Sequence, residues 1–90
     1  MWDWWVHSST SKSPISGAAA EFGARVRRLR QERGLSQEKL AATSDIHWTY
    51  LGQVERGRRN LSLHNILRIA RTLGVDAGEL MHGLQDFDGD

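Results

Sequence analysis

The chain has 90 residues, no cysteine and a net charge of +1, which suits one compact domain and excludes disulfides and thiolate chemistry. Its N-terminus, MWDWWVHSST, lacks the basic start and long apolar run of a signal peptide, and no segment approaches the roughly 18 apolar residues of a membrane-spanning helix. We therefore expect a soluble, cytoplasmic protein with no membrane association.

The charges are distributed unevenly along the chain. Residues 21–73 carry eleven basic and five acidic side chains, a net charge of +6, whereas residues 74–90 carry five acidic side chains and no Lys or Arg. A basic segment suits a polyanion, because Lys and Arg that neutralise phosphates release condensed counterions. A solvated charged surface has the same composition, so charge alone leaves both interpretations open.

Composition divides the chain into three segments. The first combines three tryptophans with a Ser-, Thr-, Pro- and Gly-containing stretch that shows neither helical nor strand periodicity. We expect a flexible Trp-containing N-terminal arm over residues 1–17, a folded domain over residues 18–84 and an acidic C-terminal tail over residues 85–90.

The predicted elements of the domain are helices, because apolar residues recur at spacings of three and four and no alternating strand pattern survives. The first helix spans about residues 18–33, where Phe22, Val26 and Leu29 share a face, and Gly34 ends it. Short helices are only marginally stable in isolation. We therefore expect an all-α fold in which all the helices share one core.

Two short amphipathic helices follow, over about residues 36–43 and 48–56, and a tight turn joins them. This arrangement is typical of a helix-turn-helix. Such a unit needs a small residue where its helices cross, which Ala41 or Ala42 supplies, and an apolar residue in the angle, which Ile46 supplies. With Leu51 and Val54 directed inward, the opposite face of the second helix points outward. It carries His47, Trp48, Thr49, Gln53 and Arg56.

Two more helices complete the prediction. Ser62 is placed to cap a helix that Gly74 ends, and Asp76 with Glu79 forms a capping-box pattern for a last short helix. The apolar stripe of the longer helix consists of Leu63, Ile66, Leu67, Ala70 and Leu73. The polar, basic loop before Ser62 is expected to be exposed.

Over residues 25–80 the sequence resembles the Cro/repressor-type, or Xre-type, helix-turn-helix family, most specifically in LSQEKLA, YLGQVERGRRNLSL and LRIARTLGV. The resemblance implies a five-helix, lambda-repressor-like domain and a transcription regulator, a repressor or controller protein, that binds operator DNA as a homodimer. Two positions depart from the family pattern. Asp45 stands where the family usually has Gly, although Asp tolerates a left-handed backbone, and Trp48 stands where small, polar or basic residues predominate.

The resemblance also implies roles for single residues. Gln37 corresponds to a phosphate-contacting Gln, and Gln53, one turn from Thr49, is the predicted base reader because Gln can make two hydrogen bonds to adenine. Trp48 either packs on a thymine methyl or sugar or covers the edge of the core. Phosphate contacts are expected at His47, Arg56, Arg58, Arg59 and Asn60. For these residues the alternative is an ordinary solvated surface.

Glu55 does not suit a DNA-facing role, because phosphates repel a carboxylate. By resemblance it forms a structural ion pair with Arg30 that fixes the third helix against the first. Breaking one partner of a buried pair costs about 3–5 kcal/mol. Loss of folding is therefore expected on removal of Glu55.

A homodimer on an inverted-repeat operator is expected, because two recognition helices about 34 Å apart supply specific affinity. We expect no second domain to supply contacts, so the last helix and tail are the candidates, with the intramolecular core as the alternative. The predicted dimer interface consists of Val75, Leu80, Met81, Leu84 and Phe87.

A different class of function is an interaction module, such as an antitoxin or adaptor, that binds a protein partner through Trp2, Trp4 and Trp5. Aromatic anchors are enriched in protein interfaces, whereas packing on the protein's own core and an extension outside the natural domain are the simpler explanations. Deleting residues 1–17 would distinguish them.

No enzyme, cofactor or metal site is predicted. The four histidines show no i, i+4 pair with a carboxylate partner, and no catalytic triad, phosphate-binding loop or paired-carboxylate motif stands out. The sequence gives no sign of a ligand pocket.

Overall fold

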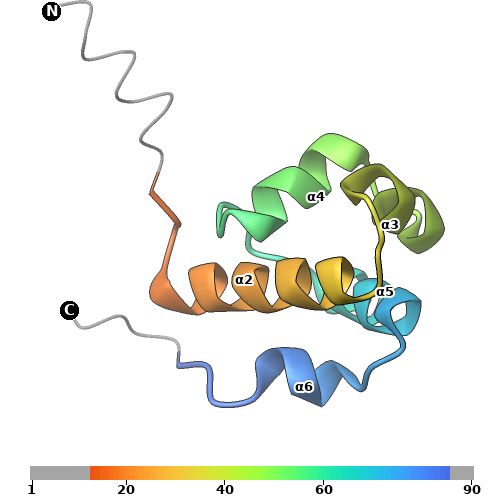
Figure 1. Cartoon of the computed structure of the whole chain (residues 1–90). Helices are drawn as coiled ribbons and strands as arrows, with labels where there is room; N and C mark the ends of the chain where they lie inside the picture. Colours follow the sequence, from red (N-terminus) through yellow and green to blue (C-terminus); the bar gives the residue numbers. More distant parts are fainter. Residues whose placement is uncertain (1–12, 86–90) are drawn as a thin grey trace, which may run out of the picture.

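The computed structural model describes residues 13–85 and contains five helices in that range, with no strand (Figure 1). The expected all-α class is confirmed, and each helix lies within about two residues of its predicted bounds. The helices are α2 (Gly17–Glu32), α3 (Gln37–Ser44), α4 (Trp48–Glu55), α5 (Leu63–Leu73) and α6 (Ala77–Met81).

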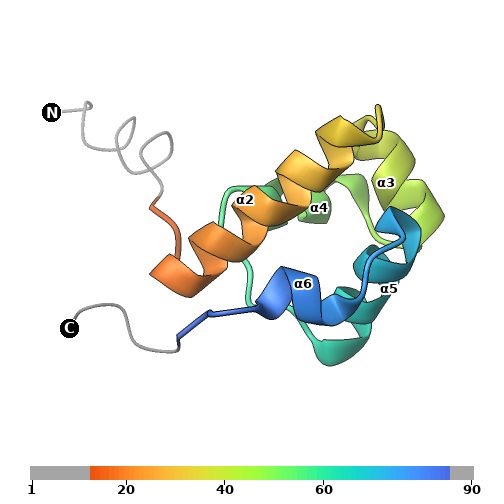
Figure 2. The same ribbon diagram turned by 60° about the horizontal axis from the view of Figure 1, so that its bottom comes forward.

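The helices pack around α2. Figure 1 shows α3 and α4 on one side of α2 and α6 on the other, with α5 near the C-terminal end of α2. In the turned view of Figure 2, α2 crosses in front of α4. The contacts agree, because α2 packs on α4, α5 and α6, and α3 packs on α4 and α5. None of these helices in residues 13–85 has the length and apolar content to cross a bilayer.

The predicted helix starts rest on side-chain caps. The Ser36 hydroxyl accepts a hydrogen bond from the Lys39 backbone N–H at 3.0 Å, and the Ser62 hydroxyl accepts one from Asn65 at 3.2 Å. Both predicted serine caps are confirmed. Asp76 caps α6 differently from a capping box, because its carboxylate accepts from Gly78, one residue before the N–H that a capping box uses.

One apolar core connects all five helices. Ala41, not Ala42, is the small residue buried at the crossing of α3. The buried apolar residues are Phe22, Val26, Leu40, Ala41, Leu51, Val54, Ile69, Ala70, Leu73 and Leu80.

The predicted stripe of α5 is wrong at two positions. Leu63 is 67% exposed and Leu67 is 46% exposed, whereas Ile69, which the stripe omitted, is fully buried. Because α5 packs on α2, α3 and α6, its inner face runs through Ile69 and Leu73. Successive residues of a helix are rotated by about 100°, so Leu67, two residues before Ile69, lies on the opposite, exposed side. Periodicity alone shows that α5 has a wide apolar surface but not which part of it is covered.

The residues before α2 are attached to the loop after α4. The Ile15 backbone N–H donates to the Gly57 carbonyl at 2.8 Å, and the Arg58 guanidinium donates to the Ser13 carbonyl at 2.6 Å. Ser16 then caps α2 by accepting from the Ala19 N–H at 2.9 Å. Part of the predicted arm is therefore bound to the domain, while its residues 1–12 and the predicted tail from residue 86 lie outside the described residues.

Candidate nucleic-acid interface

The outward face of α4 is set by its buried anchors. Leu51 and Val54 lie in the core, so the opposite side of the helix faces solvent, where Trp48 is 51% exposed and Thr49 is also exposed. His47 begins the helix as its N-cap, with its Nδ1 accepting from the Thr49 backbone N–H at 3.1 Å. The His47 imidazole thus serves as the N-cap of α4, a position where Ser, Thr, Asp and Asn are the preferred residues.

The turn before α4 keeps its geometry without glycine. Asp45 has φ 60° and ψ 46°, in the left-handed region that the sequence predicted for it. The Ile46 backbone N–H donates to the Ala41 carbonyl at 2.9 Å, and the Ile46 side chain packs on the core. The α3–turn–α4 unit is therefore closed in the expected way.

A buried ion pair joins the end of α4 to α2, on the side of the helix-turn-helix that faces the core. Arg30 of α2 donates from Nε to Glu55 Oε2 at 2.6 Å and from Nη2 to Glu55 Oε1 at 3.1 Å. The two side chains are only 11% and 3% exposed, and Arg30 also donates to the Leu35 carbonyl at 2.8 Å. Because Glu55 is paired behind α4, the outward face of that helix carries no negative charge.

Gln37, the predicted phosphate contact, also belongs to this network. Its Nε2 donates to Glu55 Oε1 at 2.9 Å, and the residue is half-buried at the start of α3. The sequence did not predict this bond, since the two residues are 18 positions apart. The contact does not test whether Gln37 binds a phosphate, which stays a prediction. It shows that Gln37 links α3 to Glu55 of α4 and, through Glu55, to Arg30 of α2.

Gln53, the predicted base reader, is bound by a neighbouring arginine. Arg59 donates from Nε to Gln53 Oε1 at 2.6 Å, and its guanidinium lies 5.2 Å from the centroid of the Tyr50 ring. Tyr50 in turn accepts a hydrogen bond from Asn65 of α5 at 3.2 Å. The structure thus brings together two residues for which the sequence predicted separate roles.

The remaining residues predicted to contact phosphates differ in exposure and in whether their side chains are already bound within the protein. Arg56 is exposed, and its side chain has no hydrogen-bond or ion-pair partner within residues 13–85. Arg58 is half-buried and donates to Ser13, whereas Asn60 is exposed. Arg56 is therefore the basic side chain of this group that is best placed to meet a phosphate.

A helix-turn-helix family model matches residues 26–80, more than half of the 90 residues. The chain belongs to the Cro/repressor-type, or Xre-type, helix-turn-helix family. The family and fold expected from the sequence are confirmed, and membership identifies the protein as a DNA-binding transcription regulator.

This helix-turn-helix protein is similar to controller proteins of restriction-modification systems. Control protein C.BamHI from Bacillus amyloliquefaciens is 48% identical over 61 residues, which cover 67% of this chain and 75% of that protein. The solved structure of the restriction-modification controller protein C.AhdI from Aeromonas hydrophila has 50% identity and a TM-score of 0.68, covering 69% of this chain and 94% of that one. SinR, a master regulator for biofilm formation crystallised in complex with DNA, has 28% identity and a TM-score of 0.63, covering 66% of this chain and 95% of that one.

The residues predicted for the dimer interface of this helix-turn-helix protein fall into different environments. Leu80 is fully buried between α6 and the other helices, so it stabilises the core and offers no surface to a partner. Val75 and Leu84 are partly buried against the core, whereas Met81 is exposed. Phe87 lies outside the described residues.

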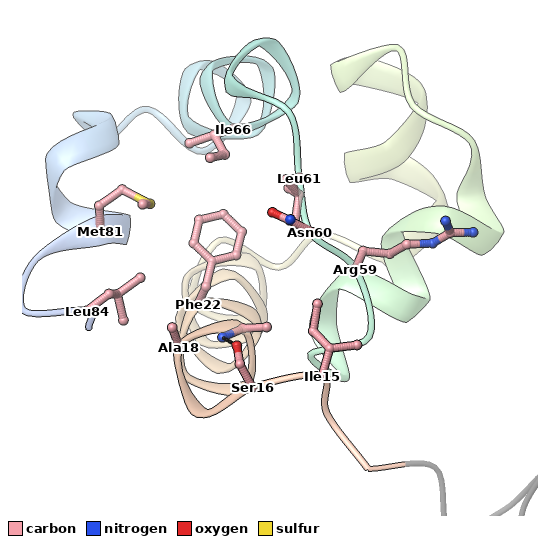
Figure 3. A pocket seen from close by; sticks show the side chains of 11 residues that line it. Ile15, Ser16, Ala18, Phe22, Arg59, Asn60, Leu61, Ile66, Met81 and Leu84 are labelled. Carbon is pink, nitrogen blue, oxygen red and sulfur yellow. Dashed lines mark hydrogen bonds between the residues drawn. The ribbon is translucent and has the colours of Figure 1, made fainter. Parts of the chain in front are cut away.

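An apolar groove of about 350 Å³ lies beside Met81, between the start of α2, α5 and α6 (Figure 3). The sequence did not predict it, because the groove depends on how three separate segments pack. Figure 3 shows the Arg59 side chain reaching away from the groove toward α4. The apolar lining includes Ile15, Phe22, Leu61, Ile66, Met81 and Leu84.

No cluster of three or more potential metal ligands occurs within residues 13–85.

Proposed function

We propose that the protein is a sequence-specific controller or repressor that binds an inverted-repeat operator as a homodimer, with α4 of each copy in the major groove. It acts in the cytoplasm without catalytic activity and needs no cofactor. This function takes its specificity from Thr49, Gln53 and Trp48 on the outward face of α4, and its affinity from phosphate contacts at the start of α3 and the end of α4.

The burial of Glu55 carries this proposal. Glu55 is the one carboxylate of α4, and its pairing with Arg30 removes it from the outward face. Arg56 is exposed at the end of the same helix. A helix face without negative charge beside the free Arg56 guanidinium suits the electrostatic field of a DNA duplex. C.BamHI and C.AhdI are both named as controller proteins. The similarity of the chain to them favours a controller protein over other types of transcription regulator.

Selection from a randomised duplex library, followed by salt titration on the selected site, tests this function. We expect enrichment of an inverted repeat whose half-sites lie about one helical turn apart. Log affinity should fall linearly with log salt, with a slope of about −0.9 per phosphate contacted. Arg56→Ala should reduce the magnitude of that slope by about 1. Weak binding that is indifferent to sequence would contradict the proposal.

Dimerisation is assigned to an apolar face that extends from the groove along α5. Leu63 and Leu67 lie one helical turn apart on this face, beside Ile66, which lines the groove together with Met81. Large apolar side chains gathered on one exposed surface mark an interaction site. The predicted contacts Met81 and Leu84 are retained in the proposed interface.

A double variant, Leu63→Glu with Met81→Glu, should therefore be a monomer in sedimentation equilibrium under conditions where the wild type is a dimer. Its affinity for the full operator should fall by more than tenfold, because two half-site contacts are no longer linked. The matched control, His64→Glu with His82→Glu, places the same charges at the neighbouring exposed positions and should remain a dimer. A dimeric double variant would contradict the assignment.

The proposed role of the tryptophan arm in protein binding concerns residues outside the described part of the chain. A deletion of residues 1–17 would also remove the Ser16 cap and the Ile15 contact with Gly57. A deletion that stops at residue 12 tests the arm without these losses. Unchanged oligomeric state and DNA affinity would show that the arm is not needed for operator binding.

A further inference from the structure

We propose that Arg59 sets the base specificity of Gln53 by fixing the orientation of its amide, so that the two residues together read guanine rather than adenine. The inference rests on the proposed function, in which α4 lies in the major groove. It also replaces the adenine preference expected of an isolated glutamine, which can make two hydrogen bonds to that base. Arg59 is a positioning residue in this account, and Gln53 is the residue that touches the base.

The hydrogen bond between the two side chains decides which end of the amide faces Arg59. A glutamine amide has one acceptor atom, Oε1, and one donor group, Nε2 with two hydrogens. Arg59 Nε can only donate, and it lies 2.6 Å from Gln53 Oε1. Turning the amide over would place two donors against each other, so the acceptor end of Gln53 stays on the arginine.

Arg59 is itself held in place by the helices beside it. Its guanidinium lies over the Tyr50 ring at 5.2 Å from the centroid, within the range of a cation–π contact. The Tyr50 hydroxyl accepts from Asn65 Nδ2 at 3.2 Å, which ties the ring of α4 to α5. The direction of the Arg59 side chain in Figure 3, toward α4, is therefore supported by Tyr50 and Gln53 together.

This arrangement changes the hydrogen-bonding character that Gln53 presents to a base. A glutamine that reads adenine must donate to N7 and accept from the N6 amino group, whereas guanine offers two acceptors, N7 and O6. With Oε1 engaged in a charge-assisted bond, the outward end of the amide is Nε2. Oε1 keeps a second lone pair, but the adjacent positive charge favours a base acceptor over the N6 amino donor. The pair therefore matches the acceptor edge of guanine.

Binding selections with the wild type and variants test this inference. The wild type should enrich guanine at one position of each half-site, and Gln53→Ala should abolish the preference at that position only. Arg59→Ala frees Oε1, so the preference at the same position should shift toward adenine by about tenfold, the size of one well-formed base contact. Because Arg59 is exposed, its removal should leave the fold intact, which circular dichroism checks.

Arg56→Ala is the matched control, because it removes an arginine side chain that has no hydrogen-bond or ion-pair partner within residues 13–85. It should weaken all sequences alike and leave the base preference unchanged. The inference is overturned if the wild type prefers adenine at the Gln53 position, or if Arg59→Ala behaves like Arg56→Ala. If the wild type itself enriches no sequence, the proposed function fails, and this inference fails with it.

Discussion

Glu55→Ala should lower the free energy of unfolding by about 3–5 kcal/mol, the cost of leaving one partner of a buried ion pair without its counter-charge. The variant would strand the Arg30 guanidinium, which donates two hydrogen bonds to this carboxylate. It would also remove the acceptor of the Gln37 amide. Urea denaturation at neutral pH measures the change, and a fall in melting temperature should accompany it.

Two variants separate the effect of the buried pair from that of a lost charge. Glu32→Ala removes a carboxylate that lies 3.8 Å from Arg28 at the surface, with 57% of its side chain exposed, and should cost at most about 0.5 kcal/mol because solvent screens such pairs. Glu55→Gln keeps the shape and one acceptor, so its loss should be intermediate. Equal stability of Glu55→Ala and Glu32→Ala would show that the Arg30 pair does not stabilise the fold.

The helix bounds and the turn could be predicted because their causes are local in the sequence. Ser36 and Ser62 act on N–H groups three residues away, and Asp45 needs only its own backbone freedom to end α3. Signals of this kind need no knowledge of the tertiary fold. The ion pair was different, because Arg30 and Glu55 are 25 residues apart and were paired through the family resemblance.

The contacts that shape the candidate site could not be predicted in the same way. Gln37 and Arg59 were expected to meet phosphates directly, yet each is bound to another side chain of the site, Glu55 or Gln53. These pairs form because α2, α3, α4 and the following loop converge, and periodicity describes each helix separately. The exposure of Leu63 could not be predicted for the same reason. The pattern of a helix shows how much apolar surface it has, but not which part of that surface other helices cover.

Gly23 was not singled out from the sequence, although it lies where α2 crosses the end of α4. A Cβ at this position would come within 2.7 Å of the Glu55 carbonyl oxygen and closer still to that of Val54. Both obstacles are backbone atoms of a helix held by its own hydrogen bonds and by the core, so they cannot turn aside as a flexible side chain can. Gly23 thus sets the spacing between the first helix and the recognition helix.

Gly23→Ala should therefore destabilise the protein even though alanine is the better helix former by about 1 kcal/mol. Overpacking a close contact costs about 1–3 kcal/mol, and the gain in helix propensity offsets about 1 kcal/mol of this cost. We therefore expect a net loss of up to about 2 kcal/mol, and a larger one for Gly23→Val. Operator affinity should also fall for the folded fraction, because α4 must move away from α2. Urea denaturation measures the loss of stability, and titration with operator DNA, corrected for the folded fraction, measures the loss of affinity.

Gly52→Ala is the matched control, since it adds the same methyl group to α4 itself. A Cβ there would meet the Arg56 guanidinium at 3.7 Å and the Gln37 amide oxygen at 3.8 Å, which are ordinary contact distances. With no collision to offset the gain in helix propensity, this variant should be up to about 1 kcal/mol more stable than the wild type. Opposite signs for the two glycines would establish the α2–α4 contact as the cause. If Gly23→Ala were as stable as Gly52→Ala, α2 and α4 would have to lie farther apart than this fold places them.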